Sequence, residues 1–128
     1  MTYQITWEPH GVIVTYSESI NSRVLLDCYV EVNKDSRYKH VRYQIINTLN
    51  LTTIDITSRD MQLFANLDKS NSVNIPNLKF ALVANNKLVE RLSHLYGREV
   101  GTTSWELARF NNLEEAKDWV SHIEEPAL

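Results

Sequence analysis

The strand-to-helix transition that decides the fold lies in residues 49–60, which read LNLTTIDITSRD. Its first half is apolar and typical of a strand, and Thr57 and Ser58 stand where a helix begins. Thr57, with Asp60 three residues later, fits the acidic form of a capping box, in which two side chains satisfy backbone N–H groups at a helix start. We therefore predict a strand exit, a short loop and a capped helix over Ser58–Lys69.

Strands and helices alternate on both sides of this transition. Tyr3–Glu8 alternates apolar and polar residues, and the turn EPHG leads into a returning strand over Val12–Tyr16, so the two form an antiparallel hairpin. Further strands are predicted over Val41–Thr48, Leu78–Ala84 and Ser104–Phe110. Two further helices are predicted over Ser19–Asn33 and over Lys87–Tyr96, the latter ending at Gly97. The last helix is predicted to start after an Asn112 cap. Its apolar stripe reaches Ile123, and Pro126 ends the pattern.

This order predicts one α/β domain over residues 1–128. The sequence β-β-α-β-α-β-α-β-α implies a five-stranded mixed sheet, with the first strand antiparallel, the rest parallel, and four helices. Two strands alternate instead of reading as the continuous apolar runs of a parallel sheet covered on both faces. We therefore expect helices mainly on one face and a partly open second face, which is compatible with a homodimer, the commonest assembly.

Composition excludes several classes of protein. The chain has 128 residues and is 43% hydrophobic, enough for one core. Its net charge of −3 lacks the basic excess of nucleic-acid binders. No apolar run approaches the ~20 residues that a membrane span needs. Cys28 is the only cysteine, so a disulfide within the chain is excluded and we expect a cytoplasmic protein.

Three segments carry a resemblance to a known family, and they read ITWEPHGVIVTYSESI, DSRYKHVRYQIIN and SWELARFNNLEEAKDWV. Together with the element order, they resemble the STAS domain, the fold of bacterial anti-sigma-factor antagonists and of the cytoplasmic parts of sulfate transporters. More closely, the chain looks like small bacterial proteins described as STAS-like or SEC14-like. The resemblance implies a non-enzymatic regulatory module that acts through protein–protein contacts. The SEC14 label implies the alternative, a small-molecule or lipid-binding module.

The same resemblance points to residues 49–60. In the antagonists a strand exit leads to Asp-Ser-Ser-Gly at a helix start, and a cognate kinase phosphorylates the second serine. On this sequence Asp55 matches the aspartate and Thr57 takes the phosphoacceptor position, whereas Ile56 and Ser58 replace the first serine and the glycine, and Asn47 replaces an earlier aspartate. The resemblance therefore makes Asp55, Thr57 and Ser58 candidate phosphoacceptor or partner-contact residues of a vestigial phospho-switch. The alternative for Thr57 is a helix cap alone.

Other residue patterns are less specific. The densest basic stretch is KDSRYKHVR, where the candidate anion contacts are Lys34, Arg37, Lys39 and Arg42; a solvated connection is the alternative. The four histidines are scattered, and metal sites need three or four convergent ligands, so we predict no metal and no cofactor. Six aromatic residues either pack in the core or line a hydrophobic pocket: Trp7, Tyr16, Tyr43, Trp105, Phe110 and Trp119. The core is favoured, because a lipid-sized pocket would hollow out much of a chain this small.

Overall fold

The computed structural model describes residues 2–122, and it confirms the predicted order of strands and helices. The strands are β1 (Tyr3–Glu8), β2 (Gly11–Asn21), β3 (Tyr43–Asp55), β4 (Lys79–Val83) and β5 (Glu106–Phe110). The helices are α1 (Ser22–Lys34), α2 (Ser58–Asn74), α3 (Lys87–Val100) and α4 (Leu113–Ser121), with a short 3-10 helix, η1 (Tyr38–His40), before β3. Ile123 and Pro126 of the predicted last helix lie outside the described residues.

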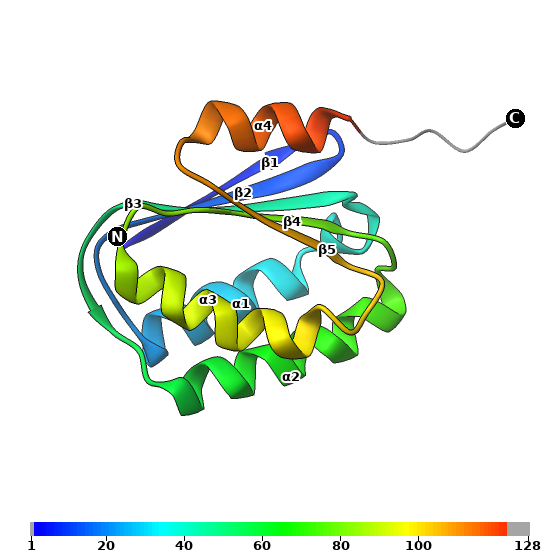
Figure 1. Ribbon diagram of the computed structural model, residues 1–128. Coiled ribbons are helices and arrows are strands. Elements are labelled where there is room, and N and C mark those ends of the chain that lie inside the picture. Colours follow the sequence, from blue (N-terminus) through cyan, green and yellow to red (C-terminus); the bar gives the residue numbers. More distant parts are fainter. Residues whose placement is uncertain (1, 123–128) are drawn as a thin grey trace, which may run out of the picture.

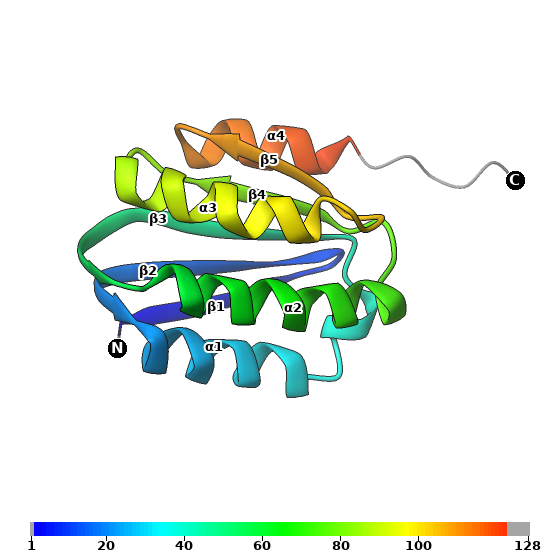
Figure 2. The same cartoon turned by 60° about the horizontal axis from the view of Figure 1, so that its bottom comes forward.

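The five strands form one mixed sheet in the order β1-β2-β3-β4-β5. β1 runs antiparallel to β2, and the other neighbours are parallel. Helices α1, α2 and α3 lie on one face of this sheet and α4 lies on the other (Figures 1 and 2). The predicted mixed sheet, with helices mainly on one face, is therefore confirmed. Within residues 2–122 no helix combines the length and the apolar character that crossing a membrane requires.

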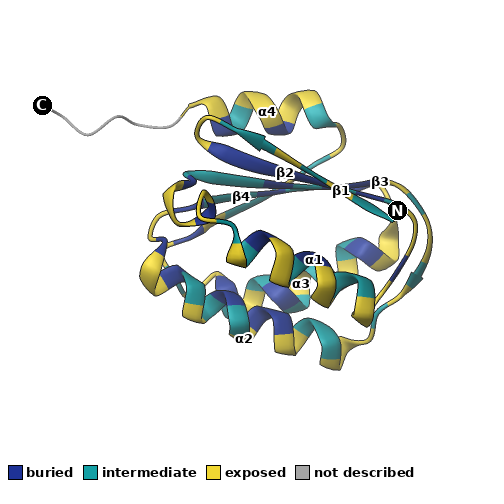
Figure 3. Ribbon diagram, turned by 180° about the vertical axis from the view of Figure 1, so that it is seen from behind, coloured by how far each residue is buried: buried dark blue, intermediate teal, exposed yellow. Residues whose placement is uncertain are grey.

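The sheet separates two hydrophobic cores, because successive side chains of a strand point to opposite faces. The larger core lies between the sheet and α1–α3. The smaller core lies under α4, where Ile45 of β3 and its neighbours on β2 and β4 pack against Ala116 and Val120. Figure 3 shows the buried residues of the helices on the sides that face the sheet.

Strands β2 and β3 are longer than the sequence predicted. Their pairing continues to Asn21 and Asp55, past register shifts between Thr15 and Ser17 and between Glu18 and Ser19. Most of the loop predicted after Thr48 is therefore strand, and only Ile56 and Thr57 separate β3 from α2. The helix predicted from Ser19 begins at Ser22, because residues 19–21 pair with β3 and the Asn21 side chain caps α1 by accepting the Val24 N–H at 2.9 Å.

The prediction that Gly97 ends its helix is wrong. Helix α3 continues to Val100, and the Gly101 N–H donates to the Gly97 carbonyl at 2.8 Å. Val100 is fully buried, and burial of its side chain stabilises the last turn by more than the glycine costs.

Replacing Gly97 with alanine is expected to raise the free energy of unfolding by about 0.5–1 kcal/mol, since the glycine lies inside a helix. A Cβ at Gly97 meets only Leu107 Cδ1, at an ordinary 3.9 Å. Urea unfolding checks this expectation. A loss of stability would mean that the backbone of Gly97 cannot accept an alanine.

Candidate functional site

The turn between β3 and α2 contains the predicted capping box. The Asp60 N–H donates to Thr57 Oγ1 at 3.1 Å, and the Thr57 N–H donates to Asp60 Oδ2 at 2.9 Å. Thr57 has an extended backbone, with φ −94° and ψ 165°, as an N-cap residue requires. The sequence prediction that Thr57 caps this helix is therefore confirmed.

The turn also brings the three candidate contact residues together on the surface. Asp55, Thr57 and Ser58 are exposed, whereas the intervening Ile54 and Ile56 are half-buried and pack against the larger core. This in-out alternation continues the pleat of β3 to the start of α2. The polar groups of this turn therefore face solvent at the carboxyl edge of the sheet.

Asn47, which the resemblance places at an earlier acidic position, is not part of this surface. Its side chain is buried in β3, where Oδ1 accepts the Leu49 N–H at 3.2 Å. It lies eight residues before Asp55 on the same strand, which is roughly 26 Å at about 3.3 Å per residue. Its role in this structure is to order the backbone of β3.

Replacing Thr57 with alanine is expected to lower the free energy of unfolding by about 1 kcal/mol, because the first turn of α2 loses its cap. Replacing Ser58 with alanine is the matched control, because its side chain lies one position inside the helix, where no cap bond is made. Urea unfolding of both variants checks the expectation. Equal stability of the two variants would show that the capping box contributes nothing.

The basic candidates lie at the opposite edge of the sheet from Thr57, around the end of α1 and the start of β3. Arg37 donates two hydrogen bonds to the Asp35 carboxylate, from Nε at 3.0 Å and from NH2 at 2.8 Å. Its guanidinium also lies 4.6 Å from the centre of the Trp7 ring. The hydrogen bonds from Arg37 lower the pKa of Asp35 to about 2. Arg37 therefore has a structural role that the sequence pattern did not reveal.

The other three basic candidates lie on the chain segments next to Asp35 and Arg37, and they are not close to the Thr57 turn. Lys34 and Lys39 are exposed, at the end of α1 and within η1, and Arg42 is half-buried just before β3. The 13 residues of β3 separate this edge from Asp55, a distance of about 40 Å at ~3.3 Å per residue. An anion bound here does not touch the Thr57 turn.

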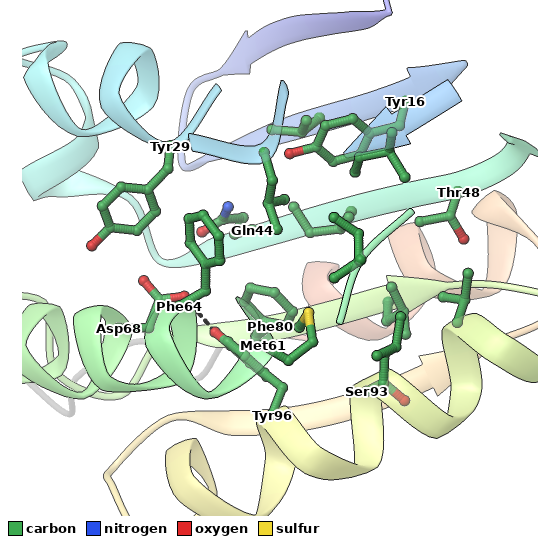
Figure 4. A pocket seen from close by; sticks show the side chains of 18 of the residues that line it. Tyr16, Tyr29, Gln44, Thr48, Met61, Phe64, Asp68, Phe80, Ser93 and Tyr96 are labelled. Carbon is green, nitrogen blue, oxygen red and sulfur yellow. Dashed lines mark hydrogen bonds between the residues drawn. The ribbon is translucent and has the colours of Figure 1, made fainter. Parts of the chain in front are cut away.

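A cavity of about 330 Å³ lies between the sheet and helices α1–α3, and it is partly open to solvent (Figure 4). Most of its lining is apolar and comes from β2–β5 and all three helices. Gln44 and Thr48 of β3 also line it, although the alternation along this strand placed Gln44 on the side that we expected to be partly open. The sequence favoured a filled core over a lipid-sized pocket, and the structure leaves a smaller space of about 330 Å³.

One end of the cavity is polar. The carboxylate of Asp68 on α2 accepts a hydrogen bond from the Tyr96 hydroxyl of α3 at 2.5 Å (Figure 4). It accepts a second one from the Asn71 amide at 3.1 Å. The same Asn71 nitrogen lies 2.8 Å from the Tyr29 hydroxyl and 3.0 Å from Asn33 Oδ1, so its two hydrogens are shared among three acceptors and tie α2 to α1. Burial raises the pKa of Asp68 to about 6, against the smaller opposing effect of the two hydrogen bonds.

The aromatic residues lie as the core interpretation predicted, with one exception. Of the six candidates only Tyr16 lines the cavity. Trp105 is buried and donates its indole N–H to the Ile75 carbonyl at 2.7 Å, while Trp119 packs against Phe110 at the α4 face. The aromatic residues that do line the cavity include Phe64, Phe80 and Tyr96, which were not among the six candidates.

Cys28 is buried on α1, as predicted, and its side chain also lines the cavity. Removal from solvent raises the pKa of its thiol to about 11, so the thiol stays protonated at neutral pH. A protonated, buried thiol is a poor nucleophile and a poor metal ligand. Cys28 therefore acts here as a small apolar side chain.

Comparison with solved structures identifies the architecture. The unphosphorylated form of the anti-sigma factor antagonist SpoIIAA superposes with a TM-score of 0.63 at 17% identity, covering 96% of this chain and 99% of that chain. An anti-sigma factor antagonist from Mycobacterium paratuberculosis gives 0.62 at 15% identity, covering 94% and 93%. The chain has a STAS-like fold.

Two further structures extend the likeness. The phosphorylated form of SpoIIAA from Bacillus gives a TM-score of 0.61 at 14% identity, covering 92% of this chain and 98% of that chain. A DUF3478 protein from Shewanella loihica with a SpoIIAA-like fold gives 0.56 at 10% identity, covering 92% and 91%. The sequence matches no family model and no curated protein. At these identities the STAS-like likeness concerns the fold, and the function rests on the residues themselves.

Proposed function

We propose that the protein is a non-enzymatic cytoplasmic regulatory module that binds another protein through the turn and helix start formed by Asp55, Thr57 and Ser58. The observation that carries the proposal is the position of these three exposed polar residues at the capped start of α2. In the STAS-like antagonists that the sequence resembles, this is the position of the phosphoacceptor. Thr57 takes that role here.

The local chemistry supports a phosphate on Thr57. A helix N-terminus stabilises negative charge through its free N–H groups and its dipole. A phosphate adds about −1.5 to −2 charges, which next to Asp55 and Asp60 would make this surface strongly acidic. An acidic partner surface would then be repelled, so phosphorylation would release a partner with such a surface.

The neighbouring surface of α2 supports a protein partner over a small anion. Leu63 lies one turn beyond Arg59 on the exposed side of this helix, and 55% of its surface is accessible. Single exposed apolar side chains are common on protein surfaces, and this one gives the polar surface around Thr57 an apolar contact point. Leu63 would supply the apolar contact of the proposed interface.

The test compares partner recovery from native lysate for the wild type, Thr57→Ala, Ser58→Ala and Thr57→Glu. We expect Thr57→Glu to reduce the recovered partner at least tenfold, because the carboxylate mimics part of the phosphate charge. Thr102→Glu is the matched control, since Thr102 is also exposed but follows α3 at the other edge of the sheet. The turn is only structural if all of these proteins recover the same partner in equal amounts.

The cavity favours a second function, the binding of a small hydrophobic ligand, which the SEC14 label in the sequence resemblance also implies. The two functions are compatible, because the cavity lies inside the domain and the turn lies on its surface. A homodimer stays a prediction from the sequence. Light scattering at micromolar concentration checks it, and a monomer there would contradict it.

A further inference from the structure

The cavity has two chemically different ends. Asp68, Tyr29 and Asn33 lie toward the amino ends of the parallel strands, beside the hydrogen bond between the Tyr38 hydroxyl and Gln44 Oε1. Toward the carboxyl ends of the strands the lining is mainly apolar and includes Ile20, Leu25, Leu51, Ile54, Ile56 and Val89. Thr48, Ser93, His94 and Arg109 add polar groups to the same lining. The space therefore matches a molecule that is polar at one end and mainly hydrocarbon along the rest.

Size and lining both favour a bound organic molecule over water. A volume of about 330 Å³ falls at the lower end of the ~300–1,000 Å³ range of small-molecule sites. A buried water needs about 2–4 polar partners, and the apolar end of the cavity offers few. Ordinary protein interiors leave few voids larger than a water molecule, so this space is large for a gap between packed side chains.

The Asp68 carboxylate at the polar end of the cavity can accept further hydrogen bonds. An ionised carboxylate has about four acceptor sites, and the bonds from Tyr96 and Asn71 use two of those on Asp68. Both of these donors are uncharged, and the side chain is only 8% exposed, so solvent contributes little to balancing the negative charge. A ligand that brings a positive donor would both fill an acceptor site and offset a buried charge.

We propose that this cavity binds a small amphiphilic amine, with its ammonium group on the Asp68 carboxylate and its hydrocarbon body along the apolar lining. A fatty acid of the same length is the wrong ligand, because its carboxylate would face Asp68. A neutral alcohol can donate one hydrogen bond but leaves the buried charge uncompensated. Amine, alcohol and acid are therefore expected to bind in that order.

The experiment uses the whole chain and the fluorescent probe N-phenyl-1-naphthylamine at pH 7.5, with dodecylamine, dodecanol and dodecanoate as competitors below their micelle concentrations. The probe should bind with a saturable rise in fluorescence. Dodecylamine should displace it at a concentration at least ten times lower than dodecanoate. Absence of saturable probe binding, or equal displacement by amine and acid, would overturn the proposal.

Two cavity variants and one control locate the binding. Ile46→Trp places bulk in the middle of the cavity wall and should abolish probe binding, and Leu82→Trp does the same from the next strand if the first variant does not fold. Leu49→Trp is the matched control, because Leu49 lies on β3 but packs against the core under α4. Equal loss of binding in Leu49→Trp would show that the probe does not bind in this cavity and would contradict the proposal.

A third variant tests the head group. Asp68→Asn keeps the size of the side chain but removes its charge, so the tenfold preference for dodecylamine over dodecanoate should fall to about onefold. Circular dichroism of each variant verifies that the fold is retained. An unchanged preference in folded Asp68→Asn would show that Asp68 does not receive the amine.

Discussion

Replacing Ile45 with alanine is expected to lower the free energy of unfolding by about 2–5 kcal/mol, the range for truncating a buried isoleucine. Ile45 is completely buried in the middle of β3, between Ile13 and Ala81 on the neighbouring strands, and it packs in the core under α4. Neighbouring groups cannot easily move into the space that the alanine leaves, because β3 is held between two strands. The loss includes both the transfer of methyl groups and the cavity left behind.

The adjacent Ile46 provides the matched comparison. It points to the opposite face of β3, where it lines the cavity under α1–α3 and is only half-buried. Ile46→Ala enlarges a space that already exists, so we expect a loss of only about 1 kcal/mol from the reduced apolar burial. Urea unfolding of both variants measures the difference. Equal losses would mean that the helices close onto the sheet and that the cavity is filled by protein side chains.

The second large effect is a pH dependence centred on Asp68. Burial raises its pKa in the folded protein from an ordinary value of 3.8 to about 6. The folded state therefore holds this proton more tightly than the unfolded chain does. The stabilising contribution is complete below pH ~4 and is lost as the pH rises through 6, and the pKa difference of about 2 corresponds to about 3 kcal/mol.

The Asp68→Asn variant isolates this contribution, because asparagine does not titrate. Between pH 4 and pH 7 the variant should gain about 3 kcal/mol of stability relative to the wild type, as measured by urea unfolding at each pH. The hydroxyls of Tyr29, Tyr38 and Tyr96 near Asp68 have raised pKa values and stay protonated over this range. A constant difference between the two proteins would contradict a raised pKa at Asp68.

Local sequence signals predicted the elements well, and they failed where distant residues decide the outcome. The Thr57 cap was predictable because both partners, Thr57 and Asp60, lie within one turn of each other. The full length of β3 was not predictable, because residues 50–53 are mostly polar and become a strand by pairing with β2, more than 30 positions earlier. Gly97 resembled a helix stop, but burial of Val100 extends the helix past it.

The residues of the candidate site also divide into those that local sequence predicts and those that only distant contacts bring together. The exposed group of Asp55, Thr57 and Ser58 follows from the chain order alone. Asp68 and Tyr96 are 28 residues apart, and the cavity beside them needs all three helices to be placed over the sheet. Gln44 and Thr48 did carry a signal, since polar residues recur on one side of β3, but the pattern alone does not distinguish a wall of a cavity from a solvent-facing surface.

The central claim, that the Thr57 turn is the partner-binding surface, is tested most directly by site-specific photo-cross-linking in the native cell. A benzoylphenylalanine is placed at Ser58 in one protein and at Thr102 in another, and each adduct is identified by mass spectrometry. We predict one covalent protein adduct from position 58, no such adduct from position 102, and loss of the adduct when Thr57→Glu is added. Equal adducts from both positions, or an adduct at 58 that Thr57→Glu leaves unchanged, would contradict the account.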